Sequence, residues 1–153
     1  MSENCVLCVR AAALDASGEW TWRGDQWAIA PHPGLAAPGW FALQTVRHVE
    51  GISNLSPSQA DQLGPLLVTA ARALARTCGD VPIYTYSIGS GSPHVHILFG
   101  PPGRGRIGKD YVIGLLSRDP ILADAGGSDE IAARYRDELA SSLSEKKQPD
   151  PTR

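Results

Sequence analysis

Several features that mark other protein classes are missing from this chain of 153 residues. No run of 18 apolar residues occurs, so we expect no membrane span. The first residues lack the basic and then apolar pattern of a signal peptide, which favours a cytoplasmic protein. With 14 Lys and Arg against 16 Asp and Glu, there is no excess of positive charge for coating a nucleic-acid polymer. The three cysteines are too few for a disulfide framework and favour metal ligands or free thiols.

The length and composition are those of one soluble domain. A chain of this size can bury a core of its own, and 42% hydrophobic with 20% charged residues is ordinary for globular proteins. We assign residues 1–143 to a single domain. Residues 144–153 are polar and contain prolines, which predicts a disordered tail.

Alternation of apolar and polar residues predicts an antiparallel sheet of about five strands. Gly24 and Asp25 indicate a tight turn between the first two strands. The expected strands cover residues 19–23, 27–30, 40–46, 81–87 and 94–99.

Helical signals follow the third and the fifth expected strands. A long helix should begin after Ser56 as N-cap, with Gln59 completing a capping box, and should end near Gly79. Pro65 should kink this helix or split it. A short helix is expected within residues 107–116, and a final helix capped by Ser128 carries an apolar stripe of Ile131, Tyr135, Leu139 and Leu143. Together these elements predict an α+β fold.

His94 and His96 are the most informative residues in the chain. Period-2 alternation places both imidazoles on the same face of a strand. Two such histidines can share a metal ion, or one can serve as a nucleophile. They can also simply face solvent, and the pair alone does not separate these uses.

Cys5 and Cys8 have a spacing that suits zinc, because two thiolates three residues apart can reach one ion. A closed site would need two more ligands, and the alternative is a pair of incidental reduced thiols. Cys78 is expected to be a small buried residue. The histidines available as further ligands are His32, His48, His94 and His96.

Three motifs in order resemble the histidine-triad (HIT) superfamily. They are PGWFALQTVRH at residues 38–48, NLSP at residues 54–57 and PHVHILFGP at residues 93–101. The resemblance covers about two thirds of the chain. It implies a HIT-like α+β fold with about five antiparallel strands, one long helix and C-terminal helices, and it implies a homodimer.

The N-terminal cysteines are similar to those of a zinc-bearing bacterial branch of this superfamily. By that resemblance the zinc ligands are Cys5, Cys8, His48 and His94, a closed set that implies structural Zn²⁺. The second histidine of the triad is the nucleophile of the superfamily and corresponds to His96. There it attacks the α-phosphorus of a nucleotide and forms a nucleotidyl-histidine that water cleaves.

The resemblance weakens around the expected nucleotide pocket. Leu98 occupies the place of the third histidine, Trp40 replaces another histidine, and His32 aligns with a ribose-binding aspartate. The phosphate loop is altered too, so that Ser87 or Ser92 would have to substitute as contacts. With the zinc ligands present, this pattern favours a retained scaffold with an altered pocket.

Two further groups have open interpretations. Arg104 and Arg106 could form an anion site at a helix start, or they could be solvated residues of a loop. The four tryptophans could be core and dimer contacts, or they could line a pocket for a flat ligand. We expect at least two of them in the core.

These observations leave three functions open. The first is a HIT-like hydrolase or transferase acting on a nucleoside phosphate or phosphoramidate through His96. The second is an enzyme or binding protein for a non-nucleotide small molecule of specialised metabolism, with His96 as general acid and base. The third is a non-catalytic nucleotide-binding module. In each case the partner is a small molecule, with no membrane and no nucleic-acid polymer involved.

Overall fold

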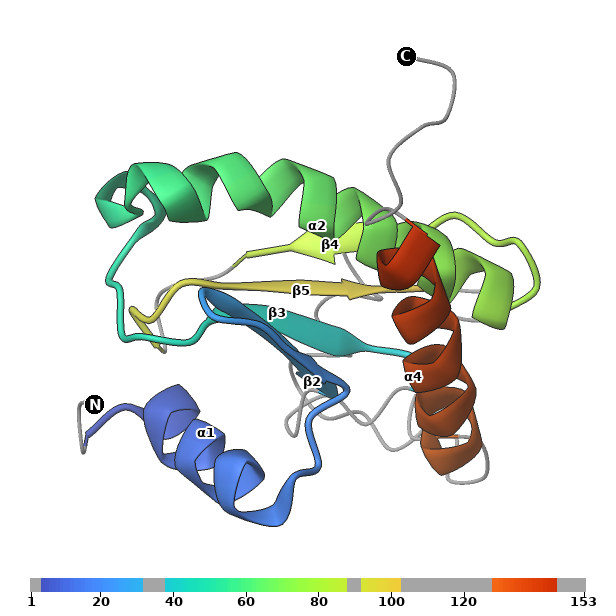
Figure 1. The fold of residues 1–153 in the computed structure, drawn as a ribbon, viewed down its shortest axis with the longest axis horizontal. Helices are drawn as coiled ribbons and strands as arrows, with labels where there is room; N and C mark the ends of the chain where they lie inside the picture. Colours follow the sequence, from blue (N-terminus) through green and yellow to red (C-terminus); the bar gives the residue numbers. More distant parts are fainter. Residues whose placement is uncertain (1–3, 32–37, 88–91, 103–127, 146–153) are drawn as a thin grey trace.

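Five antiparallel strands form one sheet in the order β1-β2-β3-β5-β4 in the computed structural model of the chain (Figure 1). The structure describes residues 4–31, 38–87, 92–102 and 128–145. The predicted α+β class with a five-stranded antiparallel sheet is confirmed. The elements are α1 (Val6–Ser17), β1 (Trp22–Arg23), β2 (Trp27–Pro31), β3 (Phe41–Thr45), a 3-10 turn (Ile52–Asn54), α2 (Pro57–Thr77), β4 (Tyr84–Tyr86), β5 (His96–Gly100) and α4 (Ser128–Glu145).

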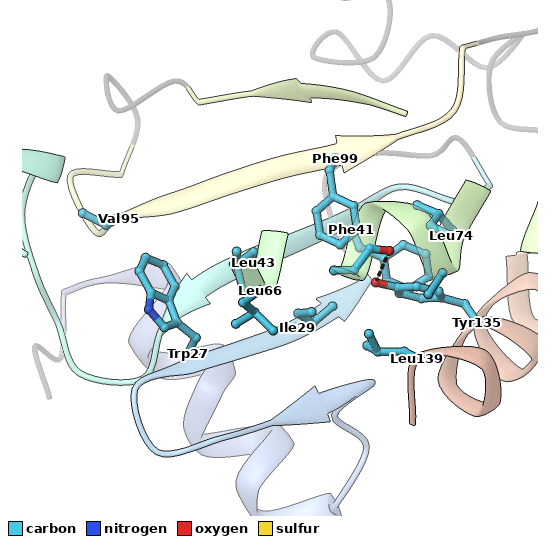
Figure 2. Close-up of a cluster of buried hydrophobic side chains, with 12 residues drawn as sticks. Trp27, Ile29, Phe41, Leu43, Leu66, Leu74, Val95, Phe99, Tyr135 and Leu139 are labelled. Atoms are coloured by element: carbon cyan, nitrogen blue, oxygen red, sulfur yellow. Dashed lines mark hydrogen bonds between the residues drawn. The ribbon is translucent and has the colours of Figure 1, made fainter. Parts of the chain in front are cut away.

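The core lies between one face of the sheet and the helices α2 and α4. Alternate residues of β3 and β5 point to this side, and Phe41, Leu43 and Phe99 belong to the same buried cluster as residues of both helices (Figure 2). The Phe41 and Tyr135 rings lie 4.4 Å apart, and the Tyr135 hydroxyl donates to the Ala70 carbonyl at 3.2 Å. The other residues of β3 and β5 therefore face the opposite side of the sheet.

Helix α2 begins as its sequence predicts and then passes Pro65 without a break. Ser56 and Gln59 make both hydrogen bonds of the capping box. The expected split near Gly64 is wrong, since one helix runs from Pro57 to Thr77. A proline inside a helix costs about 3 kcal/mol. Burial of the following apolar residues Leu66, Ala70 and Leu74 outweighs that cost.

Helix α1 was not expected from the sequence. A helix of 12 residues starts directly after Cys5 and ends at Ser17, and its C-cap Gly18 has a positive φ of 72°. The helix lacks a broad apolar stripe, because only Leu7, Cys8 and Ala11 are buried. It lies on the other side of the sheet from α2 (Figure 1).

The strands at the two sheet edges are shorter than predicted. β1 has two residues and β4 has three, and each pairs on one side only. Short edge strands are common because unpaired backbone groups stay solvated. β5 begins at His96, two residues later than expected, and His94 makes an isolated bridge with Glu50.

The C-terminal segment departs from the expected tail boundary. α4 continues through Ser144 and Glu145, because the first helix-breaking residue beyond it is Pro149. Residues 146–153 and the expected helix within residues 107–116 lie outside the described residues. In the described part of the chain, no helix is long and apolar enough to cross a bilayer.

Candidate functional site

Four side chains that are far apart in the sequence meet beside the start of β5. Cys5 is the N-cap of α1 and Cys8 lies in its first turn. His48 comes from the segment after β3, and His94 from the segment before β5. Their ligand atoms all lie within 4.8 Å of one another. The Nδ1 atom of His94 is 3.5 Å from both sulfur atoms, and the Nδ1 atom of His48 is 3.4 Å from the Cys8 sulfur. The sulfur and nitrogen atoms thus converge on one point.

The spacing of these atoms fits a tetrahedral zinc ion. Bonds of about 2.3 Å to sulfur and about 2.05 Å to nitrogen, at the tetrahedral angle, separate the two ligand atoms by about 3.6 Å. The sulfur–nitrogen distances of 3.4–3.5 Å are close to that value. Two thiols and two imidazoles are also a donor set that zinc prefers. The ligand set fills all four positions, so such an ion would cross-link the chain and hold no substrate.

Each histidine of the cluster is oriented by a partner on its far side. His94 donates from Nε2 to the Thr45 carbonyl at 2.9 Å, and His48 donates from Nε2 to the Glu50 carboxylate at 3.2 Å. A proton on Nε2 leaves the lone pair on Nδ1, the atom that faces the sulfurs. Supporting contacts of this kind fix the tautomer of metal-binding histidines.

The electrostatic environment favours the metal-binding form of two ligands. Burial raises the pKa of the Cys5 thiol, but the first-turn backbone N–H groups and the neighbouring side chains outweigh it, so the net pKa is lowered. Burial lowers the pKa of His94, which favours neutral imidazole. The hydrogen bond to Glu50 raises the pKa of His48, so protons compete for this ligand at a higher pH than for an ordinary histidine.

Helix α1 is fastened to the sheet mainly by this cluster and by polar contacts. At its C-terminal end, Asp15 accepts hydrogen bonds from Arg23 at 2.6 Å and from Trp20 at 2.9 Å. Arg10 donates to the carbonyl of Pro31. Since few of its side chains are buried, the metal cluster is the strongest anchor available at its N-terminal end.

His96 is held in the form that a nucleophile needs. It lies at the start of β5 and is 8% exposed. Its Nδ1 atom is 2.8 Å from the carbonyl of His94 and donates a hydrogen bond to it. The proton on Nδ1 places the ring's lone pair on Nε2. His94 therefore joins two sites, since its side chain belongs to the metal cluster and its carbonyl sets the tautomer of His96.

The sheet face around His96 is built from β2, β3 and β5. His96 pairs across the strands with Gln44, and Gln44 pairs with Ala28. Leu98 pairs with Ala42 in the next row. Residues in register share a face, so these side chains lie on the side away from α2 and α4. Leu98 is buried and apolar, so it offers no hydrogen bond at the place where the triad histidine was expected.

Trp40 closes one end of this face. It precedes β3, is 3% exposed, and packs against Tyr86 with ring centroids 5.7 Å apart. A Cβ atom added to Gly100 would lie 2.4 Å from the indole, so the glycine makes room for the ring. Trp27 is fully buried in the core, and Trp22 is partly buried and packs against it.

The remaining predicted contact residues are only partly placed. Ser87 donates from its hydroxyl to the carbonyl of His96 at 3.0 Å, so it supports the strand at His96. The hydroxyl oxygen of Ser92 is buried and has no hydrogen-bond partner among the described residues. His32, Arg104 and Arg106 lie outside the described residues, so their roles stay predictions.

Sequence reasoning missed Gln44. It lies in the middle of β3, 2% exposed, and its amide Nε2 atom has no hydrogen-bond partner in the part of the chain that the structure describes. A glutamine within an otherwise apolar strand core was the available signal. That Gln44 lies next to His96 follows from the register of β3 and β5, which the sequence does not reveal.

Comparisons with known proteins identify the fold. No family model matches the chain, and no curated protein sequence matches it. A zinc-bound histidine-triad family protein from Mycobacterium smegmatis superposes with a TM-score of 0.64 at 16% identity, covering 93% of this chain and 97% of the other. A HIT-like protein involved in cell-cycle regulation from Bartonella henselae superposes with a TM-score of 0.62 at 12% identity, covering 90% and 98%.

A larger protein contains the same arrangement. A uridylyltransferase mutant superposes with a TM-score of 0.64 at 14% identity, and the match covers 88% of this chain but 47% of the transferase. This chain therefore spans about half the length of that enzyme. At these identities the likeness is one of fold, and the chain has the histidine-triad fold that its motifs resemble.

Proposed function

We propose that the protein is a HIT-like hydrolase or transferase that acts on a nucleoside phosphate or phosphoramidate, with His96 as nucleophile. The observation that carries the proposal is the hydrogen bond from Nδ1 of His96 to the carbonyl of His94. It orients the buried imidazole so that Nε2 is the ring nitrogen left for the substrate. Such a nitrogen can attack phosphorus near neutral pH.

The reaction has two steps through a covalent intermediate. In the first, Nε2 of His96 forms a bond to the α-phosphorus, and the bond from phosphorus to the leaving group breaks. The leaving group departs with the bonding electron pair and takes a proton from water. In the second, water attacks the same phosphorus, the P–N bond breaks and its electron pair returns to Nε2, and the proton released by the attacking water neutralises the hydroxide left from the first step. Overall, a phosphoramidate and water give a nucleoside monophosphate and an amine.

The solved structures with this fold support a nucleotide-handling role. One of them is a uridylyltransferase, and another, from Sulfolobus tokodaii, is named a hypothetical histidine-triad nucleotide-binding protein. The zinc-bound relative supports zinc at the Cys5, Cys8, His48 and His94 cluster, where the spacing of the ligand atoms fits the ion. Bound there, zinc would be a cross-link that positions the segment carrying His94.

The test combines turnover with detection of the intermediate. Wild-type protein and His96→Ala would be incubated with adenosine and guanosine 5′-phosphoramidates, and monophosphate release would be followed. We expect the variant to lose at least about 10³-fold in turnover, because no other described side chain replaces the nucleophile. Acid-quenched wild-type protein should carry a mass increase of one nucleotidyl group on the peptide that contains His96.

Two further measurements control for loss of the fold in His96→Ala. Zinc content and thermal midpoint of His96→Ala should equal those of the wild type, so that lost turnover is not lost fold. No turnover by the wild type, together with no binding of AMP or GMP at millimolar concentration, would overturn the proposal. That result would favour a non-nucleotide small molecule as the ligand of this face.

A further inference from the structure

Gln44 carries a polar group that the described fold does not use. Its side chain is 2% exposed in the central strand β3, yet its amide Nε2 atom has no hydrogen-bond partner among the described residues. A buried donor without a partner costs about 1–3 kcal/mol. Such groups are rare in folded proteins and require an explanation.

The register places this donor beside the nucleophile. Gln44 and His96 are directly paired residues of β3 and β5, so their side chains share the face away from α2 and α4. Side chains paired in this way have Cβ atoms about 4.5–5.5 Å apart. A glutamine side chain is long enough to reach an atom that is bonded to Nε2 of His96.

The neighbours of Gln44 on this face offer the amide nothing. Ala28 pairs with it on the β2 side, and Ala42 and Leu98 lie beside it in the next row. None of these three side chains has a hydrogen-bonding atom. Tyr86 continues that row on β4, two strands away from Gln44. The apolar residue at position 98 also removes the polar group that the histidine-triad resemblance leads one to expect there. Gln44 is thus the polar side chain that is paired with His96.

We propose that Gln44 is a catalytic residue whose amide N–H donates to a non-bridging oxygen of the phosphorus attacked by His96. The inference rests on the proposed function. In the phosphoryl transition state, charge is spread over these equatorial oxygens. A fixed donor in a site withdrawn from water stabilises that charge without reorganisation. In the protein without substrate this amide has no hydrogen-bond partner, and the substrate phosphate would supply one.

Gln44→Met is the decisive variant, because methionine keeps the length of the side chain and removes the amide. Replacing an unpartnered buried polar group with an apolar group of similar shape should leave stability unchanged or slightly raised. Turnover of the phosphoramidate should fall about 10²–10³-fold, as for loss of one preorganised donor. The loss should appear in kcat, with KM changed much less, since the contact strengthens in the transition state.

Leu43→Met is the matched control. It is one residue away in β3, faces the core on the opposite side of the sheet, and introduces the same residue. Volume-conserving apolar changes of this kind cost less than about 1.5 kcal/mol. We expect its kcat to equal that of the wild type. Unfolding midpoints and zinc content would be measured for both variants alongside the kinetics.

The outcomes separate this inference from the function on which it rests. A wild-type protein without turnover overturns both. A wild type that turns over, with Gln44→Met within about twofold of it in kcat, overturns the role of Gln44 alone. A fall in kcat accompanied by an equal fall for Leu43→Met, or by a lowered unfolding midpoint, shows a structural role and also overturns it.

Discussion

The metal cluster and the face around His96 are neighbouring regions. They differ in how many of their polar side-chain atoms have a hydrogen-bond partner within the chain. In the cluster, both histidines donate to a supporting oxygen, from Thr45 and from Glu50, and their other nitrogens meet the two sulfurs. Beside His96, the amide Nε2 atom of Gln44 has no partner in the described chain. The cluster therefore needs only an ion to be complete, whereas the second region has hydrogen-bonding capacity left for a substrate.

The largest expected effect comes from removing one ligand of the metal cluster. Cys8→Ser should reduce bound zinc from one ion per chain to well below that, because three ligands remain and the hydroxyl is a poor one. Turnover should fall at least about tenfold, since the segment that fixes the tautomer of His96 loses its anchor. Zinc would be measured by mass spectrometry of metals, and α1 by hydrogen exchange.

Cys78→Ser is the control for this experiment. Cys78 caps the end of α2, outside the cluster, so zinc and turnover should both stay at wild-type levels. If Cys8→Ser lost its zinc and kept full turnover, the two regions would be independent and the shared role of His94 would be wrong.

The next effect concerns the far end of the His96 face. Gly100→Ala would place a methyl group 2.4 Å from the indole of Trp40, which is buried and cannot move aside freely. Such overpacking should lower the free energy of unfolding by about 1–3 kcal/mol. Denaturant unfolding followed by tryptophan fluorescence measures it, with zinc content expected to be unchanged.

Gly64→Ala should change the free energy of unfolding in the opposite direction, measured in the same way. Nothing lies within 4 Å of a Cβ atom at this position in α2, and its backbone is helical. The change should stabilise by about 0.4–1 kcal/mol. A destabilised Gly64→Ala, or a Gly100→Ala as stable as the wild type, would contradict the packing described for these two glycines.

A smaller effect is expected at the support of His48. Glu50→Gln removes the carboxylate that accepts from Nε2, and the affinity for zinc should fall about tenfold. Competition with a chelator of known affinity measures this. Glu138→Gln is the control, because Glu138 pairs with Arg76 on the helical side of the molecule. Equal affinities for the two variants would show that the Glu50 contact does not support the metal.

The smallest effect lies in the core, away from both regions. Burial raises the pKa of the Tyr135 phenol well above its ordinary value near 10. The folded chain therefore keeps this proton at a pH where the unfolded chain has lost it. The resulting stability is complete below about pH 10 and is lost as the pH rises further.

Tyr135→Phe tests this pH dependence. It removes the hydrogen bond to Ala70 and should cost about 1 kcal/mol at neutral pH. Above pH 10 its stability should fall less steeply than that of the wild type. Tyr84→Phe, at a half-exposed position of β4, should leave the pH profile as it is. Parallel profiles for Tyr135→Phe and wild type would contradict the assigned shift.

The parts of the fold that local sequence signals encode were predictable. The capping box at Ser56 and the strand-forming runs of β2, β3 and β5 depend on neighbouring residues, and the structure has them. Helix α1 was missed because its attachment to the sheet depends on ligands 40 residues and more away along the chain, and not on a stripe of its own. Pro65 does not split the helix, as one of the two expectations had it, because core packing, a tertiary effect, outweighs the lost hydrogen bond.

The candidate site was predictable only where the resemblance named residues. Four metal ligands followed from it, and the structure brings them together. Gln44 was not predicted, because the resemblance assigns no role to that position and its pairing with His96 depends on the strand register. The homodimer, the cytoplasmic location and the roles of His32, Arg104 and Arg106 stay predictions.

The metal cluster also has a consequence for how the chain is made. Cys8 leaves the ribosome 86 residues before His94, its most distant partner. At about 5–20 residues per second, the two thiols wait about 4–17 s before the ligand set can close. During that interval they are open to oxidation and to other metal ions. The yield of correctly assembled protein should therefore depend on zinc supply and thiol reduction while synthesis is under way, and less on conditions applied afterwards.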